Sequence, residues 1–154
     1  ISELMEALKK VGVYEITPEM KEKLSDFEGG YSTEEETKET IGGTYKSTGY
    51  VMDTHTAVAA HVSRAYRDAS KDQKKMLVAS TASPYKFARS VMTAIDEKYD
   101  ELEEFALIDE LEKVSGVAIP NAIEEIRNAQ IRHTKECDVD KMKETVKEIL
   151  GVEE

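Results

Sequence analysis

The sequence predicts an α/β fold that is mostly helical and carries two or three short strands. Apolar residues recur at helical spacing along most of the 154 residues, which indicates amphipathic helices. Two apolar runs, residues 50–52 and 76–79, stop at small polar residues directly before a helical pattern, as buried strands do when they lead into helices. No repeat, low-complexity run or proline-rich linker divides the chain, so we predict a single unit over residues 1–154.

The first third of the sequence predicts three capped helices. Residues 1–11 carry apolar side chains at helical spacing, and Gly12 supplies the stop. Thr17 caps a short second helix, and Thr33 caps a third helix whose Glu36 completes a capping box. The second helix is expected to bury a stripe formed by Met20, Leu24 and Phe27.

The middle of the sequence predicts a strand, a polar turn and a helix. Gly42 and Gly43 fall inside the third helical pattern, where each costs about 1 kcal/mol relative to Ala, so a kink or an early end is expected there. Residues 50–52 predict a brief strand, and the polar residues 53–56 then open the next helix. The inward stripe of that helix is expected to be Val58, Val62, Ala65 and Tyr66.

The second half of the sequence repeats this arrangement. Residues 76–79 predict a buried strand, Pro84 opens the helix that follows, and Gly116 ends a further helix. A short helix is expected from Pro120, and residues 131–136 predict another strand. In the final helix, capped by Asp138, the inward face is expected to hold Val139, Met142, Val146, Ile149 and Leu150. Few segments remain to pair with these strands, so the predicted sheet is incomplete.

Composition excludes several classes of function. With 21 Lys and Arg against 32 Asp and Glu, the net charge of −11 repels nucleic acid and anionic membranes. The one cysteine, Cys137, cannot form an internal disulfide, and His61 and His133 lack the spacing of metal ligands, so we expect no metal site. Without a long apolar run or a visible signal sequence, we expect no membrane span and a cytoplasmic location.

Two explanations compete for the polar residues between the apolar run 76–79 and Pro84. Ser80, Thr81 and Ser83 place hydroxyls at the start of a helix, where open α/β sheets hold ligands. Alternatively, Ser83 is an ordinary N-cap and Pro84 occupies the first helical position. Spacing alone favours the cap, because nearly every helix needs one.

Two segments of the sequence resemble the paired C-terminal signatures of the threonine synthase family. They read GYVMDTHTAVA at residues 49–59 and STASPYKF at residues 80–87. In that family the corresponding segments usually read Asp-Pro-His-Thr-Ala-Val and Ser-Thr-Ala-His-Pro-Ala-Lys-Phe. This chain has Thr54 in place of the proline and Ser83 in place of the histidine. The resemblance covers essentially all of this chain but only about the last third of the family's length.

The resemblance implies an incomplete part of a pyridoxal 5'-phosphate enzyme of fold type II, the tryptophan synthase β-like type. Such an enzyme converts O-phosphohomoserine and water into threonine and phosphate. The Schiff-base lysine belongs to the N-terminal part of such an enzyme and the glycine-rich phosphate loop to its middle part, and the missing N-terminal part of the same protein is the partner expected for this chain. No catalytic residue is therefore expected here, and the isolated chain is expected to be inactive. The family's hydroxyl at the pyridine nitrogen maps onto Thr81, with Ser80 as the second cofactor-binding candidate.

The first signature leaves two interpretations open. Asp53, His55 and Thr56 are candidates for substrate binding, but Asp53 or Thr56 also suits a helix cap, and His55 suits a hydrogen-bonded buried imidazole. Two other functions remain as alternatives to a threonine synthase part. One is a non-catalytic helical module for packing or association, and the other is a related phospho-amino-acid lyase that uses the same cofactor.

Overall fold

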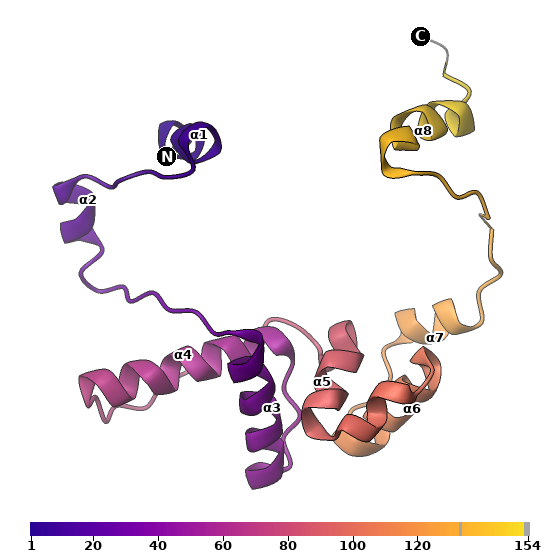
Figure 1. Ribbon diagram of the computed structural model, residues 1–154. Coiled ribbons are helices and arrows are strands. Elements are labelled where there is room, and N and C mark those ends of the chain that lie inside the picture. The colour runs from indigo at the N-terminus through magenta and orange to yellow at the C-terminus, as the bar shows by residue number, and fades with distance from the viewer. Residues whose placement is uncertain (133, 153–154) are drawn as a thin grey trace.

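The computed structural model describes residues 1–132 and 134–152, and Figure 1 shows how its helices are arranged. The α-helices are α1 (Ser2–Val11), α2 (Pro18–Lys23), α3 (Glu34–Thr48), α4 (Thr54–Ser70), α5 (Ala88–Ile95), α6 (Glu104–Ser115), α7 (Asn121–Arg127) and α8 (Met142–Leu150). Short 3₁₀-helices are η1 (Pro84–Phe87), η2 (Glu97–Glu101) and η3 (Val139–Lys141). Within the described residues the chain contains no strand, so the predicted α/β class is wrong.

The predicted strands failed for lack of neighbours. A strand is stable only when its backbone groups pair with another strand, and the described residues offer none to the runs 50–52 and 76–79. Val51 and Met52 are buried among helices instead, whereas Leu77 is fully exposed. In the third run, 131–136, the described residues are non-helical and exposed, and His133 lies outside the described residues.

The core of the structure lies where α3, α4, α5 and α6 pack together. In Figure 1, α3 crosses α4, and α5 lies between α3 and α6. These helices surround a cluster of buried apolar side chains: Ile41, Val51, Met52, Ala57, Ala60, Tyr85, Ala88, Val91, Met92, Leu107, Ile108 and Leu111. The segment that precedes α4 contributes Val51 and Met52, so the beginning of α4 is fixed directly to the core.

The predicted helix caps at Thr17 and Thr33 are confirmed, whereas the predicted cap at Asp138 is wrong, because its side chain accepts no capping hydrogen bond and α8 begins only at Met142. The backbone N–H of Glu36 donates to Thr33 Oγ1 at 3.2 Å, and the backbone N–H of Thr33 donates to Glu36 Oε2 at 2.8 Å, which completes the capping box. Thr17 accepts from the backbone N–H of Met20. Gly12 ends α1 with φ of 82°, a left-handed conformation that favours glycine.

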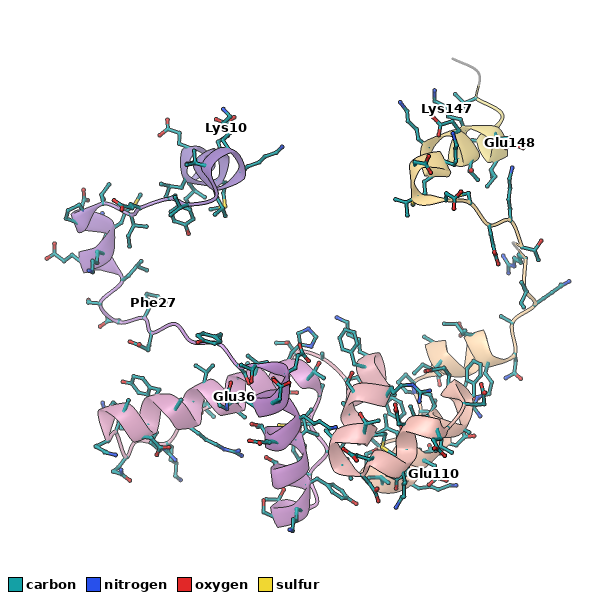
Figure 2. All side chains as sticks on the ribbon, in the orientation of Figure 1. Lys10, Phe27, Glu36, Glu110, Lys147 and Glu148 are labelled. Atoms are coloured by element: carbon teal, nitrogen blue, oxygen red, sulfur yellow. The ribbon has the colours of Figure 1, made fainter. Side chains whose placement is uncertain are left out.

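The predicted inward stripes of three helices are wrong. In α4 the buried side chains are Thr56, Ala57 and Ala60, rather than the stripe that begins at Val58. Helices α2 and α8 bury no residue, and in Figure 1 both lie away from the packed helices. Phe27, on the connection that follows α2 (Figure 2), is 74% exposed. An amphipathic pattern shows which face is apolar, but it does not supply the surface that covers it.

Gly42 and Gly43 do not end α3, which continues to Thr48, so the predicted early end is wrong. Close packing explains the presence of one of these glycines, Gly42, inside the helix. A Cβ added at Gly42 would overlap the backbone carbonyl oxygen of Ala94 in α5, whereas a Cβ at Gly43 would meet nothing within 4 Å. Gly42 therefore allows α3 and α5 to approach each other, and its helical cost is offset by the packing it permits.

These two glycines form a matched pair for a stability test. Replacing Gly42 with Ala is expected to lower the free energy of unfolding by about 1–3 kcal/mol, because the new methyl group forces the helices apart. Replacing Gly43 with Ala is expected to raise it by up to about 1 kcal/mol, since only helix propensity changes. Urea denaturation followed by circular dichroism measures both values, and equal effects at the two positions would contradict the close approach.

Candidate functional site

The candidate site is built around a buried carboxylate at the start of α4. Asp53 is only 2% exposed, and its Oδ1 accepts the backbone N–H groups of His55 at 2.9 Å and Thr56 at 3.1 Å. The Thr56 hydroxyl donates to Asp53 Oδ2. Asp53 is thus the N-cap of α4, which confirms the capping interpretation of this residue.

The same carboxylate connects the two signature segments. Ser80 Oγ lies 2.9 Å from Thr56 Oγ1 and donates to Asp53 Oδ2 at 3.4 Å. These residues are 24 and 27 positions apart in the sequence. Asp53, Thr56 and Ser80 therefore form a hydroxyl–carboxylate cluster, and we use this name for these three residues below.

Electrostatics favour the ionised form of Asp53. Burial alone would raise the pKa of Asp53, but the hydrogen bonds from the Thr56 hydroxyl and from the backbone N–H groups of Thr56 and His55 outweigh it, so the pKa is lowered. His55 Nδ1 lies 3.5 Å from Asp53 Oδ1 and adds a favourable interaction when its ring is protonated. The cluster therefore holds a permanent negative charge at neutral pH.

His55 lies beside this cluster on an accessible groove. Its side chain is 49% exposed, and its ring stacks on Phe87 with the centroids 5.7 Å apart and the planes inclined by 29°. The Lys86 ammonium lies 5.6 Å from the centre of the Phe87 ring. The groove has a volume of about 380 Å³, and its lining includes Ser32, Glu34, Thr37, Thr54, Val58 and Ser90 besides the two rings. Of the three substrate-binding candidates, His55 is the one that reaches an open space.

The second signature contributes a cap and an exposed hydroxyl. Ser83 Oγ accepts the backbone N–H of Tyr85 at 3.3 Å, so Ser83 caps η1 as the alternative interpretation predicted. Tyr85 is buried and donates to the carbonyl of Val117, and burial raises the pKa of its hydroxyl. Thr81 is exposed, and within the described residues its hydroxyl makes no hydrogen bond. The hydroxyls of this segment therefore have different roles: the Ser83 hydroxyl caps η1, whereas the Thr81 hydroxyl is exposed.

Comparison with known proteins identifies the family. Residues 56–149 match the family described as threonine synthase, C-terminal. The chain belongs to this family. The match includes Thr56, Ser80 and Thr81, and the resemblance predicted from the two signatures is confirmed.

Curated relatives with threonine synthase names are similar to the same part of the chain. Threonine synthase-like 1 of Homo sapiens is 33% identical over 99 residues, which cover 64% of this chain and 13% of the relative. Threonine synthase of Corynebacterium glutamicum is 34% identical over 102 residues, which cover 66% of this chain and 20% of the relative. The aligned part of the chain thus spans a fifth or less of these relatives.

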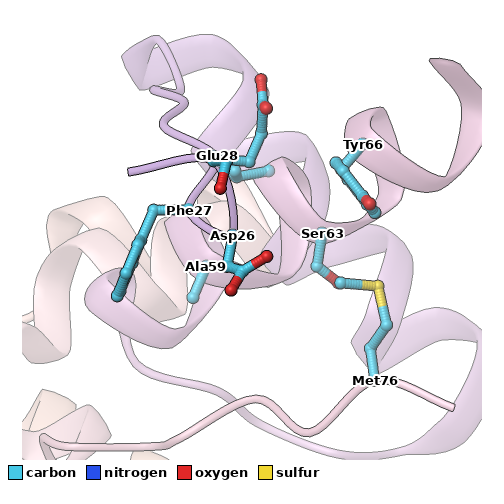
Figure 3. A pocket seen from close by; sticks show the side chains of 9 residues that line it. Asp26, Phe27, Glu28, Ala59, Ser63, Tyr66 and Met76 are labelled. Carbon is cyan, nitrogen blue, oxygen red and sulfur yellow. The ribbon is translucent and has the colours of Figure 1, made fainter. Parts of the chain in front are cut away.

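A larger groove lies on another face of α4, away from the signatures' polar residues. It measures about 540 Å³ and is lined by Ser25, Asp26, Phe27, Glu28, Ala59, Val62, Ser63, Tyr66 and Met76. Figure 3 shows Phe27, Ser63 and Met76 around it. The sequence did not predict this groove, because Val62 and Tyr66 were expected in the core. Nothing in the sequence indicated that residues 25–28 and Met76 lie beside α4. Its lining is mostly apolar with two carboxylates, a composition that gives no specific chemistry for a threonine synthase.

Residues 1–132 and 134–152 contain neither a metal-binding cluster nor a membrane-spanning helix. No group of three or more His, Cys, Asp and Glu side chains is arranged there to hold a metal ion. Among the same residues, every helix is too short or too polar to cross a membrane.

The lowered pKa of Asp53 predicts how stability depends on pH. Because the folded-state pKa lies below the ordinary unfolded value, the stability contributed by Asp53 is complete above that value and is lost as pH falls through the folded-state pKa. We expect Asp53→Asn to lose less stability than the parent chain between pH 6 and pH 2, and Asp53→Ala to cost about 1 kcal/mol at pH 7. Urea denaturation across this pH range measures both effects.

Asp68 supplies the control for this experiment. It is an exposed carboxylate on the same helix, outside the cap. Asp68→Asn is expected to keep the acid sensitivity of the parent chain. An Asp53→Asn protein with the same acid sensitivity as the Asp68→Asn protein would exclude the cap as its source.

Proposed function

We propose that this chain forms one wall of the pyridoxal 5'-phosphate site of a threonine synthase, with the Thr81 hydroxyl at the pyridine nitrogen. The observation that carries the proposal is the state of Thr81 in the second signature. Its hydroxyl is exposed and makes no hydrogen bond within the described residues, although the Ser80 and Ser83 hydroxyls are both engaged. The residue that the family resemblance assigns to the cofactor is thus the one whose hydroxyl donor is not used within the described residues.

The chemistry of this hydroxyl fits the pyridine nitrogen of the cofactor. A threonine hydroxyl donates one hydrogen bond to an unprotonated ring nitrogen, and it brings no charge into the site. When bound, pyridoxal phosphate supplies an electron sink for negative charge on a substrate carbon. Thr81 would orient the ring and keep its nitrogen neutral, whereas a carboxylate in the same place would favour the protonated ring. Ser80, the second candidate of this chain for the cofactor site, is the neighbour of Thr81, and its hydroxyl is bonded to Thr56 and Asp53.

The whole protein, on this proposal, converts O-phosphohomoserine and water into threonine and phosphate in the cytoplasm. The family membership and the names of the relatives from Homo sapiens and Corynebacterium glutamicum support this reaction class. Since the aligned residues span a fifth or less of those relatives, the cofactor-bearing lysine is assigned to another part of the protein. This chain then supplies binding and orientation without a catalytic residue, and it is inactive alone.

We assign substrate binding to the first signature, with His55 as the contacting residue. His55 is the most accessible of the three candidates and faces the groove beside Phe87. A protonated imidazole donates hydrogen bonds to phosphate or carboxylate oxygens, both of which O-phosphohomoserine carries. Asp53 Oδ1 lies 3.5 Å from His55 Nδ1, and Thr56 holds Asp53 in place.

Replacing Thr81 tests the cofactor assignment. In the holoenzyme that contains this chain, Thr81→Val is expected to weaken binding of pyridoxal phosphate by roughly fivefold, because about 1 kcal/mol of hydrogen bonding is lost. Turnover of O-phosphohomoserine should fall with it, and Thr81→Ser, which keeps the hydroxyl, should retain both. Equilibrium titration of the apoenzyme with the cofactor measures the affinity. Unchanged affinity and turnover in Thr81→Val would remove Thr81 from the site.

Replacing His55 tests the substrate assignment separately. His55→Ala is expected to raise KM for O-phosphohomoserine by roughly tenfold, since one charge-assisted hydrogen bond is worth about 1.5 kcal/mol, and to leave cofactor affinity within twofold of the parent value. Phe87→Leu removes the stacked ring without removing the donor, and a smaller rise in KM is expected for it. Steady-state kinetics with varied substrate measure both variants. An unchanged KM in His55→Ala would show that this imidazole does not bind substrate.

A further inference from the structure

We infer that the hydroxyl–carboxylate cluster positions Thr81, so that Asp53 and Thr56 act on the cofactor through Ser80 and Thr81 without touching it. This inference rests on the proposed function, because it assigns positioning residues to the same cofactor site. It also gives Ser80 a definite role, as the link between α4 and the cofactor-binding hydroxyl.

The fixed end of this link is the start of α4. Asp53 and Thr56 are 2% and 6% exposed, and their polar side-chain atoms are engaged with each other and with the first backbone N–H groups of the helix. Val51 and Met52, immediately before them, are buried in the core. A group bonded to this carboxylate is therefore held by the packed part of the structure and not by a loop alone.

The segment that the Ser80 contact anchors is the connection between α4 and η1, residues 71–83. Arg67 Nη2 donates to the backbone carbonyl of Lys74 at 2.7 Å near the beginning of this connection. Ser80, near its end, reaches Thr56 and Asp53. Between these two anchors the side chain of Leu77 is fully exposed. The contact of Ser80 with the cluster therefore fixes the backbone that immediately precedes Thr81.

The position of Thr81 depends on that contact. No backbone hydrogen bond of a helix or turn holds residues 75–81, so the contact of Ser80 is the nearest anchor for Thr81. The Ser80 hydroxyl points toward α4, and Thr81 is exposed without a hydrogen bond among the described residues. Anchoring Ser80 on α4 thus fixes the residue next to Thr81, whose exposed hydroxyl is the donor that the proposed cofactor site needs.

A double-mutant cycle in the holoenzyme tests this coupling. Ser80→Ala removes the link but leaves the cap of α4 intact, since Asp53 still accepts from Thr56 and from the backbone. We expect Ser80→Ala to weaken binding of pyridoxal phosphate by roughly threefold to tenfold, the value of one neutral hydrogen bond. In the Thr81→Val background the same change should have no further effect, because a positioning residue has nothing left to position. Ser80→Thr, which keeps a hydroxyl, should restore affinity in the Thr81 background.

The other outcomes of the double-mutant cycle distinguish failure of the positioning role from failure of the proposed cofactor site. If Thr81→Val weakens cofactor binding and Ser80→Ala does not, the positioning role is overturned while the proposed cofactor site stands. If both changes weaken binding and their effects add, Ser80 touches the cofactor itself, and the inference is overturned as well. If Thr81→Val has no effect, the proposed function fails first. Equal urea-unfolding midpoints for the parent and Ser80→Ala proteins establish that the affinity change does not arise from loss of the fold.

Discussion

The buried carboxylate of Asp53 is the interaction on which the functional half of the structure depends. One side chain accepts two backbone N–H groups and the hydroxyls of Thr56 and Ser80. A carboxylate in a nearly water-free position is stable only when such donors replace the lost water. The resulting arrangement starts α4, holds its first turn and fastens a segment that comes much later in the sequence.

Packing of the helices makes this arrangement rigid. Helix α4, with Ala57 and Ala60 buried in the core, packs against α3, and Gly42 allows α3 to lie close against α5. The core that results is confined to the middle of the chain, and α1, α2 and α8 add no buried residue to it. The rigid part of the molecule is therefore also the part that carries both threonine synthase signatures.

The sequence predicted what depends on neighbours a few residues away. The caps at Thr17, Thr33 and Ser83 and the stop at Gly12 all follow from contacts within one turn of helix. Strands at 50–52 and 76–79 were not realised, because a strand needs partners that these described residues do not provide. The candidate site likewise contains one local contact that could be predicted and one long-range contact that could not. The cap formed by Asp53 could be predicted locally, whereas the contact of Ser80 with Thr56, across 24 residues, required the fold.

The exposed run that contains Leu77 bears on how long such a polypeptide survives in a cell. An extended, non-helical stretch with bare apolar side chains is what proteases cleave and what chaperones recognise. Covering it by other parts of the protein would hide this degradation signal, and leaving it open would mark unassembled chains for removal. Proteolysis of an unshielded chain is therefore expected to begin at this short stretch.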